Sequence, residues 1–128
     1  MGKDTAKGVA RLIPAFQNSI SGFRDIWRRE SAFRQEITTL VLSVPLATWL
    51  GNSLGHTGLL IGSILLLVIV EILNSAIEAI VDRIGPERHE LSRIAKDLGS
   101  LAVVTTAIFP VFIWGASLLS WLGLISLS

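Results

Sequence analysis

Two things are scarce in this sequence: cysteine, which is absent, and charge, which is carried by only 16% of the 128 residues. Without cysteine the chain can form neither disulfide bonds nor thiolate metal sites, and this absence leaves its compartment open. The formal net charge of +1 gives no bulk electrostatic reason to expect nucleic acid as a partner. A soluble domain usually carries about 25% charged residues, whereas 51% of this chain is hydrophobic. The composition therefore predicts one small integral membrane domain.

Lysine and arginine are missing from two long parts of the chain. The eleven basic residues all lie either before Ile37 or within the segment from Arg83 to Lys96, both ends included. Basic loops stay in the cytoplasm, so both basic segments are expected on the inner side of the membrane. An even number of crossings must then lie between them. The apolar run from Ile37 to Leu50 is therefore expected to span, although a span usually needs about 20 residues.

These patterns predict an all-α membrane protein with three transmembrane helices, preceded by an N-terminal amphipathic surface helix. The surface helix is expected at about 7–29 and the spans at about 32–51, 58–83 and 97–122, all in one domain covering residues 1–128. The N-terminus is predicted in the cytoplasm and the C-terminus outside it, in the inner (plasma) membrane of the cell.

The expected surface helix is too polar to span. Its apolar residues follow helical spacing on one face, which favours a helix lying in the membrane interface. Pro14 suits the first turn of a helix, so two helical pieces joined near Ile13 are expected. Pro45 falls inside the first span, and a polar link is expected from Gly85 to Lys96.

Four polar residues form a stripe on the second span. Glu71, Asn74, Glu78 and Asp82 follow one another at steps of three, four and four, which places them on one helical face. A charge in the centre of a bilayer costs about 2.5–3.5 kcal/mol, so such a stripe predicts a functional site. Helical rise places Glu71 inside the cytoplasmic boundary, Glu78 at it and Asp82 in the aqueous layer.

The residue types at this boundary suit phosphoryl transfer. A partly desolvated Glu71 could accept a proton near neutral pH, and the carboxylates of Glu30 and Glu78 suit Mg²⁺. Lys96, with Arg11 and Arg34 in the same layer, could neutralise phosphate charge. The sequence contains neither GxxxxGK(S/T) nor GxGxxG, so the phosphate-binding loops of soluble nucleotide enzymes are absent.

Three blocks of the sequence resemble one known family. The segment Glu71-x-x-Asn74-Ser75-Ala76-Ile77-Glu78-x-x-x-Asp82 is similar to the signature of the small bacterial integral-membrane diacylglycerol kinases. Residues 30–36 (ESAFRQE) and 95–100 (AKDLGS) resemble two further blocks of that family. The resemblance runs in order from about Arg11 to Trp121.

The resemblance implies an enzyme that transfers the γ-phosphoryl group of ATP to diacylglycerol, with Glu71 as the general base. It implies Mg²⁺ held by Glu30 and Glu78, and Asp82 in a supporting role. The nucleotide-binding residues that it implies are Arg11, Asn18, Asn74, Glu87, His89, Lys96 and Asp97. The residues implied for the lipid substrate are Arg34, Gln35, Glu36, Trp49 and Ser100.

The resemblance also implies a homotrimeric helical bundle with active sites shared between subunits. Independent physical reasoning favours an oligomer, because the polar stripe needs partners that lipid cannot supply. Small residues on the last span, such as Gly99 and Gly115, would let helices approach closely.

Two other functions stay open on the sequence alone. Related small kinases of this fold act on undecaprenol, and the motifs around the carboxylates would hardly distinguish the two lipids. A proton-relay or transporter subunit could use Glu71 as a carrier. The outer halves of the predicted spans are apolar, however, which disfavours a pathway across the membrane.

Overall fold

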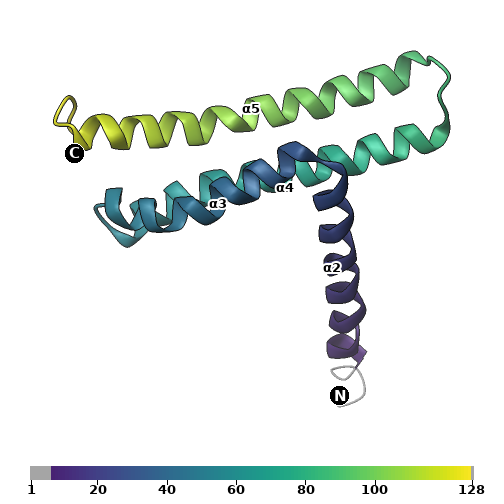
Figure 1. The fold of residues 1–128 in the computed structure, drawn as a ribbon, viewed down its shortest axis with the longest axis horizontal. Coiled ribbons are helices and arrows are strands. Elements are labelled where there is room, and N and C mark those ends of the chain that lie inside the picture. The colour runs from purple at the N-terminus through teal and green to yellow at the C-terminus, as the bar shows by residue number, and fades with distance from the viewer. Residues whose placement is uncertain (1–6, 128) are drawn as a thin grey trace. The chain divides into compact units, whose positions relative to one another are not determined.

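The computed structural model describes residues 7–127. The terminal residues themselves, whose sides of the membrane are predicted above, lie outside this range. Within it every regular element is a helix, which confirms the all-α class (Figure 1). The chain divides into two compact units, one ending at Ser31 and the other beginning at Ala32.

The first unit contains helix α2, Leu12–Arg29. A short helical piece covers residues 7–10 and ends at Arg11, whose N–H donates to the carbonyl of Lys7 at 3.2 Å. Pro14 lies in the first turn of α2, where its missing N–H costs no intrahelical hydrogen bond. The two pieces meet at Arg11 instead of near Ile13, and Arg11 itself keeps helical dihedral angles (φ −71°, ψ −23°), so the two are nearly continuous there.

Most apolar side chains of α2 are exposed, among them Leu12, Phe16 and Ile20, whereas Ile26 is buried. Phe23 and Trp27 stack one turn apart, with ring centroids 5.7 Å from each other. The spacing of these residues gives α2 one apolar face that is largely exposed among the described residues.

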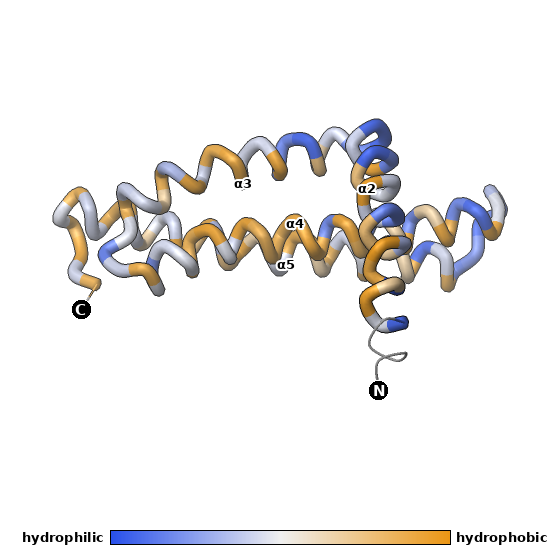
Figure 2. The backbone as a smooth tube through the Cα atoms, turned by 90° about the horizontal axis from the view of Figure 1, so that it is seen from below, coloured by the Kyte–Doolittle hydropathy of each residue, from blue (hydrophilic) through white to orange (hydrophobic). Residues whose placement is uncertain are grey.

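The second unit contains three helices that run along a common axis: α3, Ser31–Leu50; α4, Leu54–Ile84; and α5, Glu90–Trp121 (Figures 1 and 2). Side chains cap the starts of α4 and α5. The hydroxyl of Ser53 accepts from His56 N–H, and Nδ1 of His89 accepts from Leu91 N–H, each at 3.1 Å.

The prediction of a polar link from Gly85 to Lys96 is wrong in its second half. Only residues 85–89 lie outside the helices, and α5 begins at Glu90. The charged residues that follow suggested a loop, but His89 supplies an N-cap and the chain has no proline or glycine between there and Gly99. The segment 97–122 is therefore most of a longer helix.

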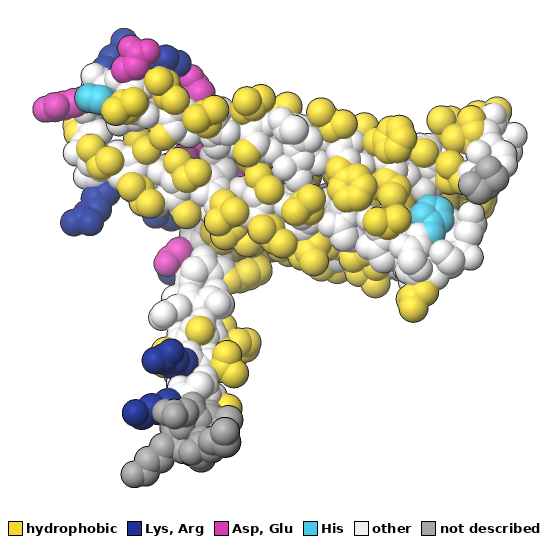
Figure 3. Space-filling model, turned by 180° about the vertical axis from the view of Figure 1, so that it is seen from behind, with side chains coloured by type: hydrophobic (Ala, Val, Ile, Leu, Met, Phe, Trp, Pro, Cys, Tyr) yellow, Lys and Arg dark blue, Asp and Glu magenta, His cyan; other side chains and the backbone are white. Residues whose placement is uncertain are grey.

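Two of the described helices, α4 and α5, are long and apolar enough to cross a membrane. Figure 3 shows hydrophobic side chains spread along the whole visible face of the second unit. Hydrophilic residues gather at the link between α4 and α5, at one end of the pair (Figure 2). The second unit is thus apolar along its length and charged at that end.

Helices α4 and α5 make most of the contacts between elements in the second unit. Leu60 and Ser63 of α4 are completely buried, and the backbone carbonyl of Leu60 accepts a hydrogen bond from the Trp114 indole at 3.0 Å. At the same end, His56 Nε2 lies 2.8 Å from the hydroxyl of Ser117, which donates to the carbonyl of Ile113. Specific polar contacts therefore fix how α4 and α5 pack at their uncharged end.

Replacing His56 by alanine is expected to lower the free energy of unfolding by about 1–2 kcal/mol. The variant loses the contact with Ser117 and the bond that His56 Nδ1 accepts from Asn52 N–H at 3.1 Å. Thermal unfolding in detergent micelles measures the effect. Thr106→Ala is the control, because that hydroxyl bonds only to Ala102 of its own helix. An equal loss in both variants would contradict the role of His56.

Candidate active site

The polar stripe of α4 runs from a buried to an exposed environment. Glu71 is 6% exposed and Asn74 is 8% exposed. Glu78 is half-buried, and the side chain of Asp82 is 61% exposed. Exposure therefore rises along the stripe in the direction of the charged end, so that its inner residues are desolvated and its last one meets water.

Asn74 lies directly against the backbone of α5. A Cβ atom added to Gly99 would collide with Oδ1 of Asn74, so only glycine leaves room for the amide. That oxygen is buried and has no hydrogen-bond partner among the described residues. The sequence predicted Gly99 as a point of close approach between helices, and the structure identifies Asn74 as the side chain that occupies the space.

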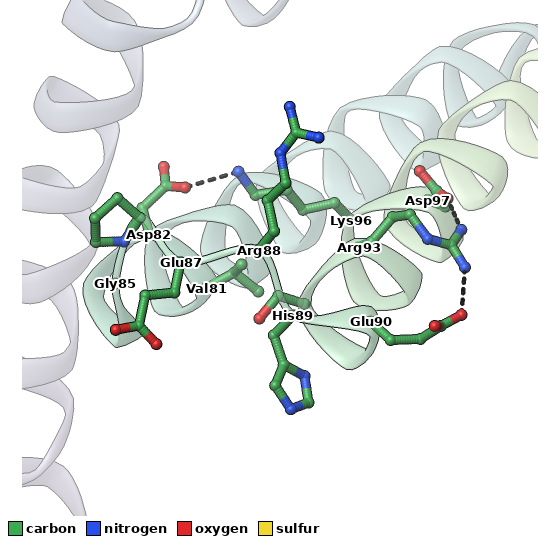
Figure 4. A pocket seen from close by; sticks show the side chains of 12 residues that line it. Val81, Asp82, Gly85, Glu87, Arg88, His89, Glu90, Arg93, Lys96 and Asp97 are labelled. Carbon is green, nitrogen blue, oxygen red and sulfur yellow. Dashed lines mark hydrogen bonds and ion pairs between the residues drawn. The ribbon is translucent and has the colours of Figure 1, made fainter.

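A cavity of about 590 Å³ lies at the charged end, between the last turn of α4 and the first turns of α5 (Figure 4). Its lining includes four of the residues predicted to bind nucleotide, together with Asp82. Those four residues are Glu87, His89, Lys96 and Asp97. Asn74 lies about two turns before Asp82 in α4, and it does not line the cavity.

One ion pair joins the two helices at this cavity. Nζ of Lys96 donates to Oδ1 of Asp82 at 2.7 Å (Figure 4). This hydrogen bond and the negative charge of Asp82 raise the pKa of the Lys96 ammonium, which precedes the predicted span. Lys96 therefore remains a cation at neutral pH. The supporting role predicted for Asp82 stays a prediction, and its contact in the structure is with Lys96.

Arg93 was not predicted as a site residue, yet it lines the same cavity. Its guanidinium donates to Asp97 Oδ2 at 2.8 Å and to Glu90 Oε1 at 3.0 Å. Glu90 and Asp97 stand three residues before and four residues after Arg93. On a helix this spacing predicts ion pairs with the arginine. These pairs were missed because the segment was expected to be a link instead of a helix.

His89 and Glu87 are both exposed at the mouth of the cavity. Figure 4 shows their side chains pointing away from the pair formed by Lys96 and Asp82. Nδ1 of His89 is occupied by the cap of α5, which leaves Nε2 as the ring atom for any ligand.

A second, largely apolar cavity of about 470 Å³ lies among α3, α4 and α5. Glu36 lines it with Thr39 and Ser43, beside the apolar side chains of Leu42 and Trp114. Oε2 of Glu36 is buried without a hydrogen-bond partner in the described chain. Glu71, on α4, is a second buried acid of this unit.

The other residues implied for the lipid substrate are dispersed. Arg34 is half-buried near the start of α3, while Gln35 and Ser100 are exposed. Trp49 lies near the far end of α3, where its ring packs on Trp121 with centroids 4.9 Å apart. Fifteen residues of helix extend about 22 Å, so the structure does not bring Trp49 to Arg34 and its neighbours.

The predicted metal ligands belong to different units. Glu30 is the residue between α2 and α3, and Glu78 lies on α4. Residues 7–127 contain no group of three or more acidic or histidine side chains arranged to hold a metal. Mg²⁺ is usually bound by one or two carboxylates together with substrate phosphates, so a single carboxylate such as Glu78 is a suitable ligand type without a complete cage. Arg11 and Asn18 are exposed residues of the first unit.

Fold and site together define a class: an all-helical membrane protein with a polar stripe that runs from a buried carboxylate to a charged cavity. Residues 17–118 match the family model for prokaryotic diacylglycerol kinase. The chain belongs to this family.

Several curated relatives match over most of their length. The chain is 50% identical to a diacylglycerol kinase of Escherichia coli K12 over 116 residues, covering 91% of this chain and 95% of the relative. It is 44% identical to one of Pseudomonas aeruginosa, covering 88% and 91%, and 40% identical to one of Haemophilus influenzae, covering 87% and 94%.

Proposed function

We propose that this chain is a diacylglycerol kinase, which transfers the γ-phosphoryl group of ATP to the free hydroxyl of diacylglycerol and releases phosphatidic acid and ADP. The observation that carries this proposal is the family match over residues 17–118, which contains Glu71, Glu78, Lys96 and Asp97. Further support comes from the burial of Glu71. The charged cavity where α4 ends and α5 begins supports it as well.

Glu71 is the general base in this proposal. It accepts the proton of the lipid hydroxyl while that oxygen forms a bond to the γ-phosphorus, and the bond from phosphorus to the bridging oxygen of ADP breaks. Its burial supports this role, because a carboxylate with little water around it is a better proton acceptor than an exposed one. Asn74, three residues further along the same face, would help to orient a reacting group through its side-chain amide.

The nucleotide would lie at the charged cavity, with Lys96 and Asp97 near the phosphates and Glu87 and His89 at the mouth. Lys96 would offset negative charge that develops during transfer. Arg11 and Asn18 of the first unit would complete the nucleotide contacts. Glu30 and Glu78 would hold Mg²⁺, which when bound supplies charge neutralisation to the phosphates of ATP.

The lipid would reach Glu71 from the apolar cavity beside Glu36. Carboxyl and hydroxyl groups at Glu36, Thr39 and Ser43 offer polar contacts to a glycerol headgroup, and the apolar lining suits acyl chains. Arg34, Gln35 and Ser100 would support this end of the pocket. Trp49, at the other end of α3, is left out of it and would contact surrounding lipid instead.

In the membrane, α3 would be a third span beside α4 and α5, with both basic segments in the cytoplasm and the C-terminus outside. The exposed apolar face of α2 supports a position in the interface of the inner membrane. Both units would form one kinase domain, and three copies would assemble with shared active sites. The many exposed apolar side chains of α4 and α5 are consistent with contacts to lipid and to other copies.

The test is a mixed-micelle assay with labelled ATP, Mg²⁺ and either diacylglycerol or undecaprenol. Phosphatidic acid is expected to form faster than the polyprenyl phosphate, because the relatives are kinases of diacylglycerol. The reverse order would assign the chain to the polyprenol kinases. Absence of lipid phosphorylation on both substrates would favour a transport role for Glu71.

A further inference from the structure

Arg93 makes the densest set of charged contacts at the cavity of α4 and α5. Its two terminal nitrogens donate to different carboxylates: Nη1 to Asp97 at 2.8 Å and Nη2 to Glu90 at 3.0 Å (Figure 4). All three residues lie in the first two turns of α5 and line the cavity. The guanidinium therefore connects an acid at the very start of α5 with an acid of the motif predicted to bind nucleotide.

The cavity is poorly balanced for a ligand as negative as ATP. Its carboxylates outnumber its cations by one, and Lys96 is already paired with Asp82. The carboxylates are Asp82, Glu87, Glu90 and Asp97, and the cations are Arg88, Arg93 and Lys96. Without Arg93, the charges of Glu90 and Asp97 would face an entering polyphosphate with no cation held between them.

We propose that Arg93 is a positioning residue for the nucleotide: it holds the Asp97 carboxylate in a fixed orientation and neutralises it together with Glu90, so that MgATP can enter the cavity. This inference rests on the proposed function and assigns a role to a residue outside the three sequence motifs. An arginine is required because its planar fork reaches two carboxylates at once, whereas a lysine presents one point charge.

A purely structural role makes a different prediction. Exposed ion pairs at i−3 and i+4 stabilise a helix only slightly, so a structural Arg93 would affect thermal unfolding without changing substrate affinity. A positioning role affects the KM for MgATP while it leaves the KM for diacylglycerol unchanged. Since both pairs are exposed, the effect of each on an equilibrium is at most about fivefold.

The experiment measures steady-state kinetics of the full chain in mixed micelles, with the wild type assayed first. Arg93→Gln is expected to raise the KM for MgATP by about three- to fivefold at low salt, with kcat and the KM for diacylglycerol within about twofold. Arg93→Lys is expected to recover part of the loss. High salt should shrink the difference from wild type, because the contacts are exposed.

Arg83→Gln is the matched control, since it removes the same charge from an exposed position in the last turn of α4 that does not line the cavity. An equal rise of KM in this control would assign the effect to bulk charge and overturn the proposal. An unchanged KM in Arg93→Gln, or a fall in kcat alone, would overturn it as well. A wild type that phosphorylates no lipid would instead contradict the proposed function.

Discussion

Replacing Glu71 by glutamine is expected to lower kcat by about 10²–10⁴-fold, the range usually contributed by a positioned general base. Glutamine has nearly the same shape but cannot accept the proton of the lipid hydroxyl. ATP affinity should stay within about twofold, because the cavity lined by Lys96 and Asp97 does not include Glu71. Phosphorylation rates in mixed micelles and ATP titration calorimetry on the same preparation measure the two effects separately.

The control for this variant is Asp25→Asn, which also neutralises one carboxylate but at an exposed position of α2. It should keep wild-type turnover. If Glu71→Gln turned over at a rate similar to this control, Glu71 would not be the base, and the half-buried carboxylate of Glu36 would be the next residue to test.

Replacing Gly99 by alanine is expected to lower kcat by about 100-fold, the cost of a misplacement of roughly 1 Å in a catalytic arrangement. The new methyl group would occupy the space now filled by Oδ1 of Asn74. Asn74 is buried and cannot swing into solvent, so either its amide or α5 must move. Kinetics should show the loss in kcat, and overpacking should also reduce thermal stability.

Gly58→Ala tests whether any added methyl group on a helix has this effect. A Cβ at Gly58 meets no atom within 4 Å, so this variant should retain wild-type rates. A double variant, Gly99→Ala with Asn74→Ala, should regain stability lost by Gly99→Ala without regaining activity, because alanine removes the amide and keeps a good helix former in α4. Stability that stays low in the double variant would show that Asn74 is not the residue displaced.

Local sequence patterns predicted much of the fold. The common face of Glu71, Asn74, Glu78 and Asp82 follows from their spacing and from helical geometry alone. The structure places all four on α4. Pro14 predicted that two helical pieces meet close to it, because its ring and missing N–H act on neighbouring residues only. Such features depend on short-range geometry, which is written directly in the order of residues.

Contacts between helices were not predictable in the same way. The ion pair between Lys96 and Asp82 joins residues of different helices, and its formation depends on how those helices rotate against each other. The early start of α5 was missed because charged residues after Gly85 resemble a loop, while the cap formed by His89 depends on a side-chain hydrogen bond. Trp49 was grouped with the lipid residues by family resemblance, although helical rise alone separates it from Arg34.

Helix α5 continues without interruption from its charged first turns into its apolar segment. Its 32 residues extend about 48 Å, with one internal proline at Pro110. The part before that proline, residues 90–109, keeps an uninterrupted hydrogen-bond ladder, so it acts as a rod that carries a tilt of one end to the other. A change in bilayer thickness that reorients the apolar part of α5 would therefore displace Lys96 and Arg93 together, and the chemistry of the phosphate end would respond to the physical state of the lipid around the other end.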